Sequence, residues 1–156
     1  MNLSYIKKQL QFWADKKDVL HVKKLLTKED QILVKRKSEE LIQNIFTFDK
    51  PWDMERCQIP YKLETLDWNI QLNDDEEWCF MLNRMDYLNY LVLSDHIEYA
   101  KTLILNWIEA HPTIQPEPST RTLDTGIRLM NFFEALPYLY TNNLFCLLYT
   151  SPSPRD

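Results

Sequence analysis

The chain of 156 residues contains a single glycine, Gly126. A typical soluble protein carries roughly 7% glycine, which would amount to about eleven in a chain of this length. Sheet proteins with many tight turns depend on glycine, because it adopts the left-handed backbone without a steric penalty. The scarcity of glycine therefore predicts an all-α fold. A hydrophobic content of 45%, with 13% aromatic residues, is sufficient for a core.

Apolar residues recur at spacings of three and four along most of the chain, as they do on one face of a helix. The pattern predicts helices near residues 3–16, 28–44, 75–93, 95–110 and 122–136. In the second helix the expected apolar face holds Ile32, Leu33, Leu41 and Ile42. In the last helix the expected inward side chains are Ile127, Leu129, Met130, Phe132, Phe133 and Leu136.

Polar residues precede several of these helices, where a side-chain oxygen can accept a free backbone N–H. Thr27 is expected to cap the second predicted helix, Asn73 or Asp74 the third, and Asp95 the fourth. The short link at Ser94 and Asp95 predicts that the helices on either side are antiparallel neighbours. Such hairpins build both solenoids and closed α/α toroids. A repeat of about 34 residues is missing, which disfavours a tetratricopeptide array.

Residues 45–72 break the helical pattern. The stretch from Ile45 to Phe48 alternates with period two, and Pro51 and Pro60 follow it. Alternation is typical of a strand with one buried face, and proline interrupts helices. We expect a short strand or two with irregular chain, strapped onto the helical body by aromatic residues.

The net charge of −5 and the isoelectric point near 5.2 argue against a general phosphate-binding surface, so no nucleic-acid partner is expected. No run of roughly 18 apolar residues is present, so no membrane span is expected. Residues 1–13 carry charged and polar side chains where a signal peptide would be apolar, which favours a cytoplasmic location.

The residues that most often carry chemistry form no recognisable set. Cys57, Cys79 and Cys146 fit neither a disulfide framework nor a zinc pattern, and we interpret them as reduced thiols. A phosphate loop and a Ser/His/Asp set are also missing. The sequence therefore predicts no catalytic residue, no metal site and no cofactor.

The histidines and the basic run have ordinary structural interpretations. His21, His96 and His111 are far apart in the sequence, and the last two lie at predicted helix ends. The basic cluster Lys35–Lys37 is expected to form a solvated helix face.

An ordered series of polar and aromatic motifs is more informative. It consists of Asp67-Trp68, then Glu77-Trp78-Cys79-Phe80-Met81-Leu82-Asn83-Arg84, then Tyr99-Ala100 with Asn106-Trp107-Ile108, and finally Arg121-Thr122-Leu123-Asp124-Thr125-Gly126-Ile127-Arg128 with Asn131. In order and spacing, over residues 45–140, this series resembles the N-terminal domain of the heparinase II/III family of polysaccharide lyases. One departure is Thr120, because the family often has an aromatic residue at that place.

The resemblance implies an incomplete α/α toroid, followed in the complete protein by a β-sandwich domain. It also implies cleavage of a uronate-containing, glycosaminoglycan-like polysaccharide such as heparan sulfate by β-elimination. This reaction needs a neutralised carboxylate, a base and an acid. The family's catalytic Asn, Tyr and His residues lie after these motifs. Residues 1–145 are therefore expected to be an inactive N-terminal part of the toroid.

Polar residues on otherwise apolar helices are candidates for contact with the acidic polysaccharide or oligosaccharide. The candidate substrate-binding residues are Arg84, Asp124, Arg128 and Asn131. An arginine can pair with a uronate carboxylate or a sulfate. The alternative is a buried ion pair, of Arg84 or Arg128 with Asp124, that holds helices together.

A second hypothesis for function is a non-catalytic helical protein-interaction module, in which aromatic side chains line a groove. A groove binder should expose an apolar patch on one complete face, whereas part of a toroid should expose an apolar edge where further helices belong. The aromatic side chains in question either stack on a ligand or, as we expect, pack in the core. They are Trp52, Trp68, Trp78 and Trp107.

The segment Cys146–Asp156 has no helical period and contains Ser-Pro-Ser-Pro near its end. Its back-translation resembles the end of a transposase sequencing adapter, and the alternative is a natural disordered terminus. We expect a non-native tail over residues 146–156, which leaves residues 1–145 as the domain.

Overall fold

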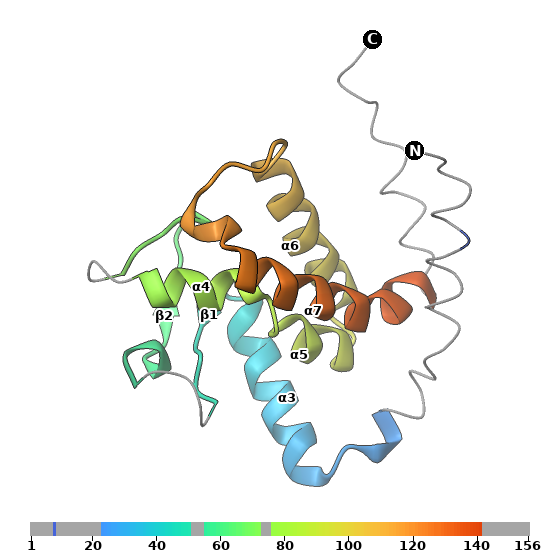
Figure 1. Ribbon diagram of the computed structural model, residues 1–156. Helices are drawn as coiled ribbons and strands as arrows, with labels where there is room; N and C mark the ends of the chain where they lie inside the picture. Colours follow the sequence, from blue (N-terminus) through green and yellow to red (C-terminus); the bar gives the residue numbers. More distant parts are fainter. Residues whose placement is uncertain (1–7, 9–22, 51–54, 73–75, 142–156) are drawn as a thin grey trace.

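The computed structural model describes residues 8, 23–50, 55–72 and 76–141 (Figure 1). In chain order its elements are α3 (Lys28–Leu41), β1 (Ile45–Phe46), the 3-10 helix η1 (Glu55–Gln58), β2 (Tyr61–Lys62), α4 (Glu76–Arg84), α5 (Leu88–Leu93), α6 (Ile97–Ala110), the 3-10 helix η2 (Pro118–Thr120) and α7 (Thr122–Thr141). The predicted all-α class is confirmed. The predicted helix 3–16, apart from Lys8, and the tail 146–156 lie outside the described residues.

Helix α7 lies at the centre of the helical part of the fold. It contacts α4, α5, α6 and η2, and Figure 1 shows it running across these helices. Its predicted end at residue 136 is too early, because the helix continues through Pro137 to Thr141. Pro137 has no N–H for the carbonyl of Phe133, and its ring crowds that carbonyl, yet the helix continues past it, and Phe133 lies at the surface.

The face of α7 that was expected to be buried is partly wrong. Leu129, Met130 and Phe133 are exposed, whereas Asp124 and Arg128 are buried. Leu136 is buried as expected. The reason is that Asp124 and Arg128 face α4 and form hydrogen bonds there with Arg84 and with the carbonyl of Asn83.

Helix α3 begins as predicted. The side chain of Thr27 accepts the N–H of Asp30, and the Asp30 carboxylate accepts the N–H of Thr27, which completes a capping box. The hydrogen bonds from Thr27 lower the pKa of the Asp30 carboxyl. Leu41 is buried as expected, but Ile32, Leu33 and Ile42 are exposed, so the predicted apolar face is only partly correct.

The buried face of α3 contains Val34, Lys37 and Ser38 instead. Lys37 was expected to be solvated with its two basic neighbours, yet only 3% of it is exposed. Its ammonium lies 2.7 Å from a carboxylate oxygen of Asp49 and donates to the carbonyl of Thr47 at 3.4 Å. These partners allow a lysine to be buried, because its charge is both paired and hydrogen-bonded.

The single helix predicted over residues 75–93 is two helices. Met85 separates α4 from α5 with a left-handed backbone (φ 55°), and its side chain is fully buried. A left-handed residue ends a helix whatever the apolar pattern beyond it. The proposed caps of α4, Asn73 and Asp74, lie outside the described residues.

Asp95 does not cap α6, contrary to the prediction. It adopts a left-handed conformation (φ 63°), and its carboxylate accepts from the ammonium of Lys23 at 2.5 Å. The residue at the cap position is His96, whose side chain makes no capping hydrogen bond. Helix α6 packs on α5 after this turn.

The predicted non-helical segment is confirmed. Strands β1 and β2 pair antiparallel, with Ile45 opposite Lys62 and Phe46 opposite Tyr61. We call the segment that contains β1 and β2 the strap. Aromatic contacts join it to α4 and to Tyr87, the residue before α5. Edge-to-face ring contacts join Phe46 to Tyr87 at 5.3 Å and Phe48 to Trp78 at 5.3 Å.

Within the described ranges, none of the helices combines the length and the apolarity that crossing a membrane requires.

Candidate functional site

The strongest concentration of polar side chains lies where α4, η2 and α7 meet. Asp124, on the first turn of α7, is completely buried. It accepts a hydrogen bond from Nε of Arg84 at 2.7 Å and another from Nε of Arg121. The Arg121 guanidinium also lies over the ring of Phe80, 3.6 Å from its centroid. One carboxylate therefore joins two arginines from different parts of the chain.

This contact agrees with the ion-pair alternative for Arg84 and Asp124. The side chains of Arg84 and Arg121 are 19% and 39% exposed, so the network reaches the surface on the arginine side. Arg84 also lies 3.8 Å from a carboxylate oxygen of Glu77. The hydrogen bond to Asp124 raises the pKa of Arg121, and the charges of Glu76 and Glu77 act in the same direction.

Arg128 is buried one turn farther along α7, with 2% of its surface exposed. Its guanidinium donates to the carbonyl oxygens of Asn83 at 2.7 Å and Ser119 at 3.1 Å, and to Oγ1 of Thr125 at 3.0 Å. The guanidinium carbon lies 3.9 Å from the centroid of the Trp107 ring. Burial lowers the pKa of Arg128 to about 10, so the group stays charged at neutral pH.

Asn83 links α4 to the segment around Trp68, to α6 and to α7, and the sequence did not mark it as a site residue. Its Nδ2 donates to the carbonyls of Trp68 at 2.7 Å and Cys79 at 2.9 Å. Its Oδ1 accepts from Nε1 of Trp107 at 2.9 Å, and its own carbonyl accepts from Arg128. The sequence did carry a signal for it, namely an asparagine within an otherwise apolar helix. Such a residue is rare there unless its polar atoms find hydrogen-bond partners.

The remaining candidate, Asn131, is half-buried and donates from Nδ2 to the carbonyl of Arg84 at 2.8 Å. Arg84 is the last residue of α4, so this bond satisfies a carbonyl that the end of a helix leaves without an intrahelical partner. The structure thus brings all four predicted site residues into one neighbourhood. Their contact with sugar stays a prediction.

His111 belongs to the same network and ends α6. Its Nδ1 lies 2.7 Å from the carbonyl of Trp107, and its Nε2 lies 2.9 Å from Oγ of Ser119. The imidazole stacks on the Trp107 ring with a centroid distance of 4.2 Å. Both nitrogens are engaged, so the ring serves as a helix-end clamp, as the sequence suggested.

The tryptophans that the structure describes are packed within the protein. Trp68, Trp78 and Trp107 each expose less than a tenth of their surface. Nε1 of Trp68 donates to Oδ1 of Asn106 at 2.9 Å. These rings present no open face for stacking on a sugar. Trp52 lies outside the described residues.

The two described cysteines, Cys57 and Cys79, are buried. Sγ of Cys79 lies 3.2 Å from the carbonyl of Trp68, and burial raises the pKa of this thiol to about 12. A protonated, enclosed thiol is a poor nucleophile. Cys57 and Cys79 therefore act as core residues.

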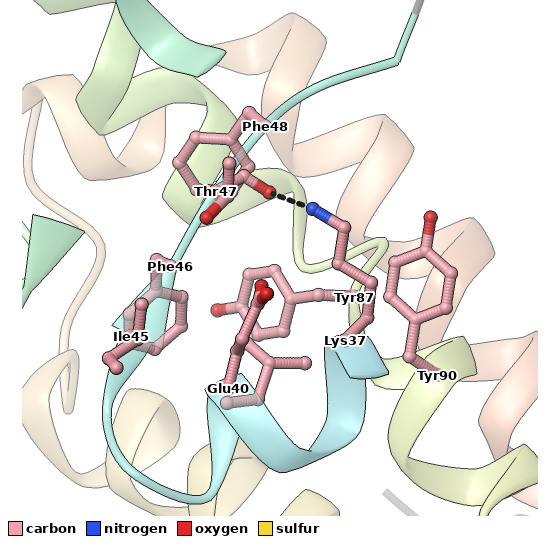
Figure 2. Close-up of a pocket in the computed structure, with 9 residues that line it drawn as sticks. Lys37, Glu40, Ile45, Phe46, Thr47, Phe48, Tyr87 and Tyr90 are labelled. Atoms are coloured by element: carbon pink, nitrogen blue, oxygen red, sulfur yellow. Dashed lines mark hydrogen bonds between the residues drawn. The ribbon is translucent and has the colours of Figure 1, made fainter. Parts of the chain in front are cut away.

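A small hollow lies between the end of α3 and the strap (Figure 2). Lys37, Thr47, Phe48, Tyr87 and Tyr90 are among its lining residues. Oγ1 of Thr47 is buried there without a hydrogen-bond partner. The hollow has room for about one water molecule, so it does not accommodate a sugar ring.

In the part of the chain that the structure describes, no group of three His, Cys, Asp or Glu side chains is arranged to hold a metal ion. The polar network contains three arginines, with Asp124 bonded to two of them and Glu76 and Glu77 close to Arg121. Charges of both signs are therefore present, and no group is poised as a base or nucleophile. Its evident chemical effect is to join α4, α6, η2 and α7.

No family model, no curated protein and no solved structure matches this chain.

Proposed function

We propose that residues 1–145 are the N-terminal helical part of a lyase that cleaves uronate-containing polysaccharide by β-elimination, and that this part is inactive alone. In this proposal α4 to α7 begin an incomplete α/α toroid. The resemblance to the heparinase II/III family in the ordered motifs is its starting point.

The observation that supports the proposal most is the convergence of those motifs. Trp68, Asn83 and Trp107 are joined by hydrogen bonds, and Arg84 is joined to Asp124 in the same network. An ordered series of short motifs is expected to mark a folding unit when its residues pack together. Residues of these motifs that lie up to about sixty positions apart in the sequence pack together, and this supports a common structural role for the motif series.

The proposal divides the four candidate residues into two roles. Asp124 and Arg128 are buried and hold the helices, so their effect on a polysaccharide would be indirect. Arg84 and Asn131 are partly exposed beside them, and these two are the residues assigned to contact with an acidic sugar. Asp124 fixes the orientation of the Arg84 guanidinium, which favours binding of a carboxylate or sulfate.

The test is an ultraviolet absorbance assay for the unsaturated uronate that β-elimination produces. The chain of 156 residues and a protein that continues residues 1–145 with the rest of its coding sequence are incubated with heparan sulfate, chondroitin sulfate and hyaluronate. We expect product from the longer protein and none from the chain alone. Turnover by the chain alone, or a folded longer protein without activity on any of these polymers, would contradict the proposal.

A further inference from the structure

The three arginines of the polar network differ in how many of their N–H donors find partners. A guanidinium carries several such donors, and those that are buried need acceptors. Arg128 uses both of its terminal amino groups, on two backbone carbonyls and on the hydroxyl of Thr125. With 2% of its surface exposed, Arg128 has no donor available to a ligand.

Arg84 is also largely engaged within the protein. Its Nε donates to Asp124, one terminal nitrogen lies 3.1 Å from Sδ of Met81, and the other lies 3.8 Å from a carboxylate oxygen of Glu77. Its side chain is 19% exposed. An anion that binds Arg84 would therefore compete with Glu77, which leaves Arg84 a secondary contact.

Arg121 is the exception among the three. Its Nε donates to the carboxylate of Asp124, and among the described residues its two terminal amino groups have no hydrogen-bond acceptor. Its side chain is 39% exposed, the largest value of the three. The guanidinium lies over the ring of Phe80. Asp124 and Phe80 thus hold the group at one edge and one face, and the terminal amino groups stay unpaired.

We infer that Arg121 is the residue that binds the acid group of the sugar, and that this group is a uronate carboxylate. Two parallel N–H donors on a planar guanidinium match the two oxygens of a carboxylate. Because Asp124 and Phe80 already hold the guanidinium, binding costs little further side-chain freedom. The inference rests on the proposed function for its choice of an acidic sugar as the ligand.

The charges around Arg121 favour a lone carboxylate over a densely sulfated sugar. The carboxylates of Asp124, Glu76 and Glu77 act on Arg121 by their charge. Further sulfates on the same ligand would meet the two glutamates in the first turn of α4, and the chain has a net charge of −5. Hyaluronate carries a carboxylate on every second sugar and no sulfate. We therefore expect it to bind at least as tightly as heparin.

The experiment is a titration of the full chain with tetrasaccharides, followed by nuclear magnetic resonance of the backbone amides and of the Arg121 Nε–H group. The ligands are a hyaluronate tetrasaccharide, a heparin tetrasaccharide and, as the neutral control, a tetramer of N-acetylglucosamine. One bidentate contact supports a dissociation constant on the order of 1 mM. We expect shifts around Arg121 with hyaluronate, none with the neutral tetramer, and no tighter binding of heparin.

Arg121→Lys keeps the positive charge beside Asp124 but removes the planar pair of donors. It should raise the dissociation constant for hyaluronate about tenfold. Arg36→Lys is the matched control, because Arg36 on α3 also lies within 4 Å of two carboxylates and is 57% exposed. The control should leave the dissociation constant unchanged. Circular dichroism establishes that each variant is folded.

An absence of shifts at about 10 mM hyaluronate tetrasaccharide overturns the inference. It is also overturned by unchanged binding in Arg121→Lys, by an equal loss in Arg36→Lys, or by heparin that binds tenfold more tightly than hyaluronate. If Arg121→Lys does not fold, the parent chain decides, because shifts that lie away from Arg121 contradict the assignment. An inactive longer protein would refute the lyase proposal and leave this binding result standing.

Discussion

The first half of α7, from Thr122 to about Phe133, reverses the pattern of an ordinary amphipathic helix, whereas its second half buries Ala135, Leu136, Tyr138 and Leu139. The inner face places Asp124 and Arg128 in the interior, where at most 2% of either residue is exposed. The outer face presents Met130 and Phe133 to solvent. The comparison shows that apolar residues alone did not decide the orientation of this helix. The hydrogen-bonding demands of Asp124 and Arg128 act together with the burial of Leu136 and Leu139.

A buried polar face is stable only when its groups find partners, because burial of an unpaired polar group is costly. Arg128 satisfies this condition with two carbonyls and a hydroxyl, and Asp124 with two arginines. The outer face has no such requirement, so changes there should be tolerated. This difference in sensitivity can be measured.

The largest effect is expected from Arg128→Met. The change removes the donors for the carbonyls of Asn83 and Ser119 and leaves both buried. We expect the free energy of unfolding to fall by about 3 kcal/mol. Urea unfolding followed by circular dichroism measures it. Arg36→Met on the exposed side of α3 is the control. An equal loss of stability in both variants would show that the buried arginine is no more important than an exposed one.

Asp124→Asn should have the next largest effect. The neutral amide no longer balances Arg84 and Arg121, but both arginines retain some solvent. We therefore expect a loss of about 2 kcal/mol, below the range for fully buried pairs. Asp95→Asn serves as the control, because that carboxylate is exposed and asparagine tolerates its left-handed backbone. A larger loss from the control would show that the buried carboxylate is not the more important one.

On the outer face, Gly126→Ala should stabilise the monomer by about 0.5–1 kcal/mol, because alanine has the higher helix propensity and its methyl meets no atom. Thermal unfolding at low protein concentration measures this gain. Destabilisation would mean that something in the monomer already lies above Gly126.

The smallest effect is expected from Met130→Gln. Met130 is 69% exposed, and glutamine is also a good helix former, so monomer stability should change by at most about 0.5 kcal/mol. The same urea titration measures it at low concentration. A loss comparable to that of Arg128→Met would place Met130 within the core and refute the comparison between the two faces.

The helices were predictable where local signals agree. Thr27 and Asp30 define the start of α3, and the alternation after Ile45 predicted the strap. The break at Met85 was not predictable, because a methionine carries no local preference for a left-handed backbone. Its side chain is fully buried in the core, so the left-handed turn accompanies tertiary packing and not a local signal.

The candidate site was predictable as a set of unusual residues. Arg84, Asp124, Arg128 and Asn131 stand out as polar positions in apolar helices, and the structure places them together. Their partners were not predictable, since Arg128 bonds to the carbonyls of Asn83 and Ser119. Any residue offers a carbonyl, so the sequence cannot indicate which one an arginine will find.

The sequence by itself determined that the chain is helical, since one glycine and a period near 3.6 leave few alternatives. It also determined that α3 begins after Thr27 and that a strand replaces the helical pattern at Ile45. Only the tertiary structure decided which face of α3 and α7 is buried. An exposed Ile32 and a buried Lys37 reverse the ranking by hydrophobicity. They do so because burial free energy depends on partners from distant segments, and Asp49 and Thr47 supply them for Lys37.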